Sequence, residues 1–279
     1  MVKLNRRIIQ ILTAIGANPY FSNFVNAKIH KGSSKAVCAP FLNCYSCPGA
    51  ALGCPIGSVQ AVLGSMRYKF SFYVFGMIAL FGILFGRFIC GFLCPFGFLQ
   101  DLLYKIPTPK FKVPKILTYI KYPILLFFVV LFPIFLTNDV GMGDPFFCKY
   151  LCPAGTLEGG IVLVAGNPGL QATIGLLYYW KLGLVGMFII SSIFFYRPFC
   201  KVLCPLGAFY AFFNRISFYQ LELSKDKCIG CGKCTRTCKM QVNPVENINS
   251  KECIRCGECI EVCPTNAIKS NISNFRNKN

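Results

Sequence analysis

Eighteen cysteines stand among the 279 residues of the chain, and most of them follow spacings that suit metal or cluster ligation. Near the C-terminal end the spacing C-x2-C-x2-C-x3-C occurs twice, which is typical of proteins that bind two 4Fe–4S clusters. In such proteins the fourth cysteine of each run ligates the other cluster. The expected ligand sets are Cys228, Cys231, Cys234 and Cys263 for cluster 1, and Cys253, Cys256, Cys259 and Cys238 for cluster 2. Zinc is the weaker interpretation, because zinc sites typically use two C-x2-C pairs that lie farther apart.

A second spacing, C-x3-C-P-x-G, comes twice directly after an apolar stretch. Residues 76–97 and 186–207 match at Gly-Met, Arg, Cys, Cys-Pro and Gly, which indicates an internal repeat. A 4Fe–4S cluster usually takes four thiolates, so a pseudo-twofold axis would join two pairs into cluster 3, formed by Cys90, Cys94, Cys200 and Cys204. Arg87 and Arg197 precede these pairs by three residues. They would offset the negative charge of the cluster, act as interfacial anchors, or do both.

Six further cysteines are expected on the opposite face: Cys38, Cys44, Cys47, Cys54, Cys148 and Cys152. The similarity of CPIGSVQ (54–60) to CPAGTLE (152–158) favours Cys54, Cys148 and Cys152 as ligands of a fourth cluster, with Cys47 as the fourth ligand. Cys38 and Cys44 would then form a disulfide or supply additional ligands. Two alternatives stay open: a set made of Cys38, Cys44, Cys47 and Cys54 alone, or two to three disulfides and no cluster.

Other redox and catalytic chemistry finds little support in the sequence. The chain has one histidine, His30, and no C-x2-C-H, so no haem is expected. No acid–base pair, nucleophile or phosphate loop is visible, so we expect no catalytic residues here. The chemistry would then take place on a partner, with this chain as a non-catalytic electron-transfer subunit of an oxidoreductase complex.

The elements that must position these cysteines are apolar stretches. Hydrophobic residues make up 54% of the chain and charged residues 14%, with a mean hydropathy of +0.54, which indicates a membrane protein. Four candidate spans cover residues 8–27, 70–86, 122–138 and 176–196, the first interrupted by Asn18-Pro19. The charge-free parts of the last three are slightly shorter than the roughly 20 residues that cross a bilayer, and flanking Lys and Arg could make up the length. Residues 49–63 and 159–170 are shorter or broken, and we expect them to be re-entrant or interfacial pieces.

The positive charge is distributed as in a membrane protein. The net charge is +19, and the basic residues flank the apolar stretches, which argues against a nucleic-acid partner. Counting Lys and Arg in the loops places both termini in the cytoplasm of a multi-pass protein of the cell (inner) membrane.

The predicted fold is therefore mainly α. Residues 1–218 would form a membrane-embedded helical bundle of about four spans, built from two parallel repeats (about 6–106 and 121–216) with re-entrant pieces. Residues 219–268 would form an α+β bacterial-type ferredoxin domain with two 4Fe–4S clusters, and residues 269–279 a polar tail.

Two C-x3-C-P motifs after apolar spans, followed by a double-cluster ferredoxin, resemble the NapH/NosR-type polyferredoxin membrane proteins, most closely the short NapH-like form. The resemblance implies electron transfer between a membrane quinol pool, or a soluble ferredoxin donor, and a partner reductase. The cysteine-rich segment 42–57 and the third C-x3-C-P at Cys148 go beyond the minimal NapH-like pattern.

Two functions remain open from the sequence. The first is electron transfer between the ferredoxin clusters and the Cys90/Cys94/Cys200/Cys204 cluster, with a further step across the membrane if the outer cysteines also hold a cluster. The alternative is an assembly or metal/thiol-reducing factor for a partner metalloprotein, with the outer cysteines as its working site. A transporter is the weaker interpretation, because the spans lack the buried Asp or Glu of ion pathways.

Overall fold

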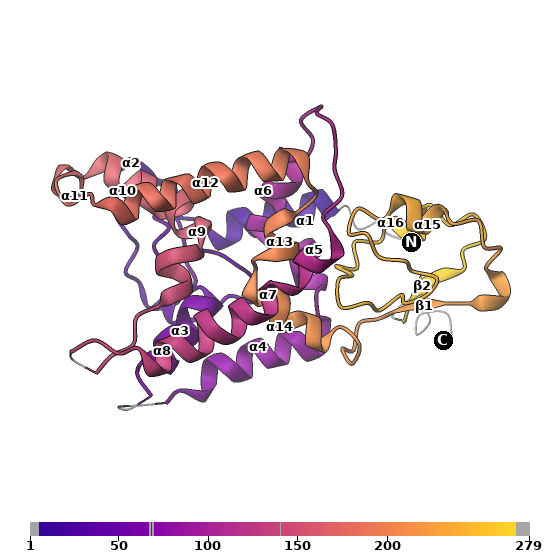
Figure 1. The fold of residues 1–279 in the computed structure, drawn as a ribbon, viewed down its shortest axis with the longest axis horizontal. Helices are drawn as coiled ribbons and strands as arrows, with labels where there is room; N and C mark the ends of the chain where they lie inside the picture. The colour runs from indigo at the N-terminus through magenta and orange to yellow at the C-terminus, as the bar shows by residue number, and fades with distance from the viewer. Residues whose placement is uncertain (1–5, 67, 69, 140, 272–279) are drawn as a thin grey trace.

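The computed structural model describes residues 6–66, 68, 70–139 and 141–271. The structure is mainly helical, and a helical body carries a smaller C-terminal unit at one end of its long axis (Figure 1). The helical body ends near residue 218, and the C-terminal unit follows without a long linker.

The helical body contains many short helices, which include 3₁₀ and π segments labelled η. The first half consists of α1 (Arg6–Ala17), α2 (Ser22–Val25), η1 (Ser33–Ala36), α3 (Pro55–Gly64), α4 (Phe72–Phe85), α5 (Phe88–Phe92) and α6 (Pro95–Leu103). The second half consists of η2 (Lys115–Tyr119), α7 (Lys121–Pro123), η3 (Ile124–Leu131), α8 (Phe132–Phe135), η4 (Phe147–Leu151), α9 (Pro153–Gly155), η5 (Thr156–Gly160), α10 (Ile161–Gly166), α11 (Pro168–Gln171), α12 (Leu176–Phe194), α13 (Pro198–Val202) and α14 (Pro205–Phe213).

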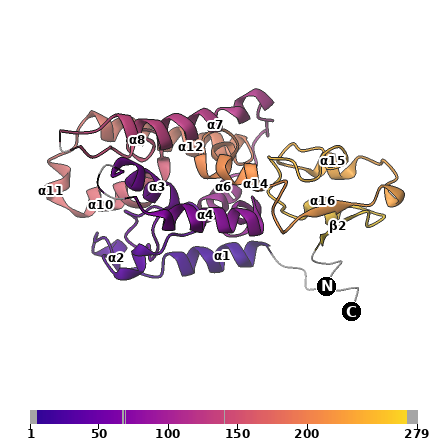
Figure 2. The same ribbon diagram turned by 90° about the horizontal axis from the view of Figure 1, so that it is seen from below.

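Two helices in the described part of the chain are long and apolar enough to cross a membrane. One runs over Lys115–Phe135 and joins η2 to α8, and the other is α12, Leu176–Phe194. Helix α4 is apolar but has only 14 residues. Helix α1 ends at Ala17, because Pro19 disfavours the helical conformation for Asn18, so the predicted stretch 8–27 is not one helix. Helices α1, α4 and α7–α8 still run along the long axis (Figure 2).

The two predicted re-entrant pieces are short helices in the structure. Residues 55–64 of the first form α3, whose side chains are largely buried. The second breaks at Asn167-Pro168 into α10 and α11, as the Pro predicts.

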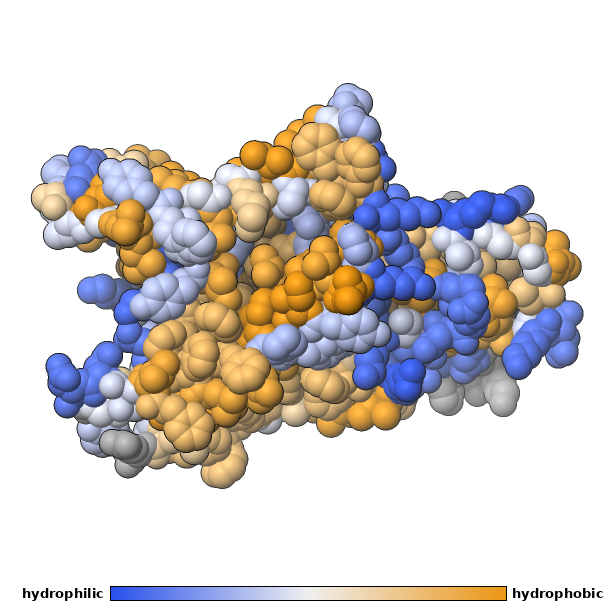
Figure 3. Space-filling view, in the orientation of Figure 1, coloured by the Kyte–Doolittle hydropathy of each residue, from blue (hydrophilic) through white to orange (hydrophobic). Residues whose placement is uncertain are grey.

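The surface of the helical body is largely apolar. On the face shown in Figure 3, hydrophobic residues cover most of the body, and hydrophilic residues gather where the C-terminal unit begins and at the opposite end of the body. Large side chains such as Phe72, Phe135 and Leu176 are more than 70% exposed. Such extensive apolar exposure is uncommon on a monomeric protein in water and is typical of a surface that meets lipid or another protein.

The C-terminal unit has the small α+β composition expected of a ferredoxin. Its elements are β1 (Leu221–Leu223), η6 (Lys225–Lys227), α15 (Lys233–Thr237), α16 (Glu258–Glu261) and β2 (Ile268–Ser270). Strands β1 and β2 pair antiparallel, with Leu221 opposite Ser270. The predicted boundary at residue 268 therefore falls inside β2, and residues 272–279 of the predicted tail lie outside the described residues.

Buried polar contacts dock this unit onto the helical body. Arg87 and Lys121 both contact the carboxylate of Glu252, and the side chains of both cations are fully buried. The side-chain amide of Asn214 donates to the carbonyls of Ser250 (2.6 Å) and Cys253 (2.9 Å). These bonds hold the segment around Cys253 against the ends of the helical body.

Candidate metal centres

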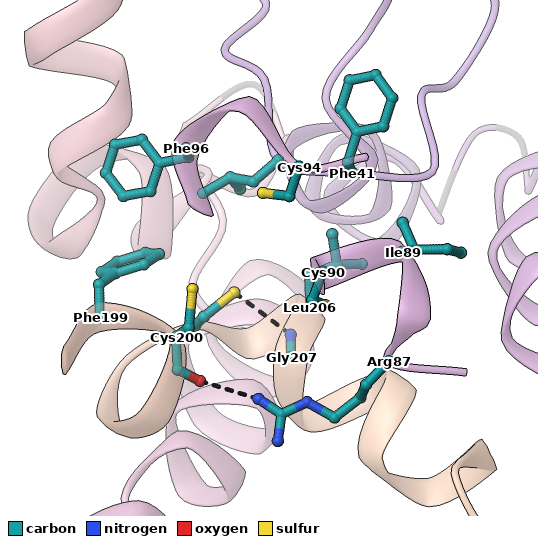
Figure 4. Close-up of a pocket in the computed structure, with 12 residues that line it drawn as sticks. Phe41, Arg87, Ile89, Cys90, Cys94, Phe96, Phe199, Cys200, Leu206 and Gly207 are labelled. Atoms are coloured by element: carbon teal, nitrogen blue, oxygen red, sulfur yellow. Dashed lines mark hydrogen bonds between the residues drawn. The ribbon is translucent and has the colours of Figure 1, made fainter. Parts of the chain in front are cut away.

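Four cysteines from the two halves of the helical body line one enclosed cavity. They are Cys90, Cys94, Cys200 and Cys204, and we call this group the inner site. Figure 4 shows Cys90, Cys94 and Cys200 around this space, with Phe96 and Phe199 at its side. All four side chains are at most 8% exposed. The structure thus brings together the four residues that the repeat pattern predicts for cluster 3.

The Cys-Pro sequence explains how two of these thiols are positioned. Cys94 and Cys204 are the residues before α6 and α14, each in an extended conformation with Pro at the first helical position. Their sulfurs accept hydrogen bonds from Gly97 N–H (3.4 Å) and Gly207 N–H (3.3 Å). The helix N-terminus and these N–H groups favour a negatively charged sulfur.

The two predicted arginines connect the halves of the site crosswise. Arg87 donates to the carbonyl of Cys200 (3.2 Å), and Arg197 donates to the carbonyl of Cys90 (2.6 Å). Arg197 also binds Asp101 through two bonds of 2.7 Å. Burial alone raises the pKa of Asp101, but Arg197 and Arg6 outweigh burial and hold this pKa well below its usual range. Both arginines thus join the two halves by hydrogen bonds and also place positive charges near the thiols.

Gln100 belongs to the inner site and was missed by the sequence analysis. Its side-chain amide is fully buried and donates to Cys200 Sγ at 3.1 Å. Hydrogen bonds to sulfur are among the factors that set cluster potentials. The position of Gln100, six residues after Cys94 in C-P-x-G-x-x-Q, is the pattern that could have identified it.

In the C-terminal unit, one of the two predicted ligand sets lines a single cavity. Cys238 joins Cys253, Cys256 and Cys259 there, and we call this group the second ferredoxin site. This is the crossed arrangement predicted for cluster 2. Of the other set, Cys231 is exposed and the remaining members, Cys228, Cys234 and Cys263, are partly buried. Their assignment to cluster 1 stays a prediction.

The six outer cysteines divide differently from the expectation. Cys44, Cys54, Cys148 and Cys152 line one cavity near α3 and α9, and we call this group the outer site. Cys47, the expected fourth ligand, lines a neighbouring cavity, and its thiol contacts Asn18 Oδ1 at 3.5 Å. The Cys38 thiol contacts its neighbour's carbonyl, that of Ala39. No disulfide joins cysteines in the part of the chain that the structure describes.

The donor set of the inner site, four thiols from two pairs, is the one that a 4Fe–4S cluster takes. Among the described residues, no three His, Cys, Asp or Glu side chains converge as one metal ion requires. In a mononuclear zinc site every sulfur would lie about 2.3 Å from the same ion. At the inner site four thiols instead surround a cavity, and N–H groups face their sulfurs. Burial raises the pKa of Cys94, as do its neighbours Cys200 and Cys90, so a bound cation would favour the thiolate form.

Comparisons with known proteins identify the same segments. Residues 70–114, 122–170 and 177–222, together half of the chain, match a family model described as a 4Fe-4S binding domain. Residues 246–269 match a second 4Fe-4S binding domain model. No solved structure matches the chain significantly.

The relatives include two archaeal proteins and a bacterial one. The uncharacterized proteins MJ0749 and MJ0750 of Methanocaldococcus jannaschii are 30% and 31% identical over 60% and 63% of this chain, which cover 57% and 68% of the relatives. The regulatory protein NosR of Pseudomonas aeruginosa is 28% identical over 61% of this chain, which spans only 23% of NosR. The chain belongs to the 4Fe-4S binding domain family and is a NapH/NosR-like iron–sulfur protein.

Proposed function

We propose that the chain is a membrane-bound electron-transfer protein in which the C-terminal ferredoxin unit exchanges electrons with the inner site. Bound 4Fe–4S clusters would supply the one-electron chemistry. The observation that carries the proposal is the convergence of Cys90, Cys94, Cys200 and Cys204 on one buried cavity beside the docked ferredoxin unit.

The contacts between the two sites favour a short path for electrons. Arg87 lines the inner cavity and also donates to the carbonyl of Lys251 and to the carboxylate of Glu252, the two residues before Cys253. On α5, Gly91 touches the ferredoxin unit so closely that an added Cβ would lie 2.5 Å from the carbonyl oxygen of Ile254. Close approach matters because electron tunnelling decays steeply with distance.

A membrane location is the second part of the proposal. Two helices have the length and hydropathy of spans, and the body exposes large apolar side chains. We propose that the ferredoxin unit and both termini are on the cytoplasmic side, because the loops that precede and follow the apolar stretches on that side are rich in Lys and Arg. The cell membrane would then surround the helical body with about four spans, α1 and α4 being the shorter ones.

For the reaction partners we propose a quinol pool or a soluble ferredoxin on one side and a partner reductase on the other. The inner cavity is lined by four thiols, by aromatic and aliphatic side chains and by Arg87, which together can hold a cluster and exclude water. Bond-making chemistry would take place on the partner.

The test compares Cys94→Ala with Cys38→Ala, a buried cysteine that lines neither four-cysteine cavity of the helical body. The full chain is purified anaerobically in detergent, its iron and sulfide are counted, and it is reduced with dithionite. Reoxidation of the clusters by a short-chain quinone is then followed by EPR. We expect Cys94→Ala to lose about four irons and to reoxidise much more slowly, whereas Cys38→Ala should match the parent. Full iron content and an unchanged rate in Cys94→Ala would remove the inner site from the path.

The alternative, a factor that reduces a metal or a thiol for a partner, gives a different result in the same preparation. It predicts iron only in the ferredoxin and inner sites, together with outer thiols that titrate reversibly as a disulfide. The four thiols of the outer site line one cavity, so a pair of them could form the disulfide that this alternative requires.

A further inference from the structure

We propose that the outer site, formed by Cys44, Cys54, Cys148 and Cys152, holds an additional 4Fe–4S cluster and extends the electron path to the face opposite the ferredoxin unit. The proposal goes beyond the exchange between the ferredoxin unit and the inner site. It rests on three features of the outer site that repeat those of the inner site, on contacts that identify Cys44 as the fourth ligand, and on a wall that the two cavities share.

The first common feature is the Cys-Pro helix start. Cys54 and Cys152 precede α3 and α9 in extended conformations, with Pro at the first helical position, as Cys94 and Cys204 do at the inner site. The backbone N–H groups of Gly57 and Gly155 face the sulfurs of Cys54 and Cys152. All four thiols thus lie at helix N-termini that favour a thiolate.

The second common feature is a glutamine that reaches the opposite segment. Gln60, six residues after Cys54, donates to Cys148 Sγ at 3.2 Å, as Gln100 donates to Cys200 Sγ. Gln60 is also fully buried, and its oxygen accepts the N–H of Phe147 (2.9 Å), which fixes the direction of the amide. A neutral amide held on a sulfur by such a bond suits a cluster ligand.

The third common feature is a cation on the carbonyl of the first cysteine. Lys181 Nζ donates to the carbonyl of Cys148 at 3.1 Å, where the inner site uses Arg197 on Cys90 and Arg87 on Cys200. Lys181 lies within α12, an otherwise apolar helix. The structure gives this charge a place beside the thiols of the outer site.

Further contacts identify Cys44 as the remaining ligand. Cys148 Sγ lies over the start of α3, 4.0 Å from the position that a Cβ of Gly57 would take. Cys44 Sγ lies over α9, 3.6 Å from the position that a Cβ of Gly155 would take. A cysteine of each half thus lies over the helix start of the other half. The N–H of Cys44 donates to Glu158 Oε2 (2.7 Å), and Glu158 follows Cys152 by six residues.

The inner and outer cavities share Leu42 as a common wall. A hydrocarbon core of about 30 Å is too wide for a single tunnelling step, and two sites within the helical body divide it. One electron would enter the outer site from the inner site and leave to a one-electron acceptor beyond the outer face, with no bond made or broken. The acceptor class is a one-electron oxidant, for which ferricyanide is the probe.

The test separates Cys44 from Cys47, two cysteines of the same loop. The full chain, purified anaerobically, should contain about 16 irons, and Cys44→Ala about 12, whereas Cys47→Ala should keep about 16. The irons that remain in Cys44→Ala show that the chain has folded. In vesicles that enclose ferricyanide, dithionite added outside should reduce it through the parent and Cys47→Ala but not through Cys44→Ala.

Three results would overturn the proposal. They are a parent with about 12 irons, loss of iron in Cys47→Ala but not in Cys44→Ala, or equal ferricyanide reduction by both variants. A parent with about 8 irons would instead refute the proposed function as well, because the inner site would then be empty, so the two failures are distinguishable.

Discussion

Glu252→Gln removes the carboxylate on which docking of the ferredoxin unit depends, and it preserves the size of the side chain. Glu252 accepts a 2.8 Å bond from Arg87 and contacts Lys121, and both cations are fully buried. Removing one partner of a buried ion pair costs about 3–5 kcal/mol. Because the Glu252 side chain is itself 21% exposed, we expect a cost of about 2–3 kcal/mol.

Hydrogen–deuterium exchange in detergent measures this cost at the docking contact. A loss of about 2–3 kcal/mol should raise amide exchange near Cys253 about 30- to 150-fold if opening of the contact limits exchange. Glu258→Gln is the matched control, since its partners Arg6 and Lys239 are partly exposed and the loss should stay below about 1 kcal/mol. Equal exchange in the two variants would refute the claim that the buried cations need Glu252.

The same carboxylate makes docking dependent on pH. Burial raises the pKa of Glu252, but Arg87 and Lys121 outweigh burial and hold this pKa below its usual value. A depressed pKa means that the contribution is complete above the unfolded value of about 4.3 and is lost as the pH falls through the folded value. The protection of amides near Cys253, taken as the measured exchange rate relative to the intrinsic rate at the same pH, should therefore be constant around neutral pH and be lost only in acid.

Three further predictions concern the metal sites. Gln100→Leu removes one hydrogen bond from Cys200 Sγ and should lower the potential of the inner cluster by about 20–65 mV, the equivalent of about 0.5–1.5 kcal/mol, in an EPR-monitored redox titration. Asp101→Asn leaves Arg197 without its carboxylate and should lower the free energy of unfolding by about 3–5 kcal/mol in thermal or denaturant unfolding. Because the pKa of Asp101 is depressed, the parent should lose this contribution to stability only below about pH 4. Removal of iron with a chelator under reducing conditions should lower the unfolding temperature of the parent more than that of Cys94→Ala, since fewer structural clusters are left to lose.

The residues that could be predicted from the sequence are those fixed by local spacing or by the repeat. The C-x2-C-x2-C-x3-C runs predicted the second ferredoxin site, including the crossed contribution of Cys238. The matching C-x3-C-P motifs predicted the inner site, although its pairs come from opposite halves of the chain. In both cases the short spacing within a motif determines which thiols lie close together, and the second copy of the motif indicates which thiols complete the set.

The parts that could not be predicted depend on long-range contacts. Cys44 and Cys47 belong to one irregular loop, and no periodicity indicates which thiol turns toward Cys152. The choice is made by contacts such as that of the Cys44 N–H with Glu158, and that of Cys47 with Asn18. Gln60 and Gln100 were missed for the same reason, because their sulfur partners lie on another segment.

The crossed arginines also constrain how the protein is made. Arg87 reaches the carbonyl of Cys200, and Arg197 reaches that of Cys90, so neither half completes the inner site alone. A ribosome that has finished only the first half has delivered two thiols without their counterparts. Assembly of a cluster at this site would therefore have to wait until translation has passed residue 204.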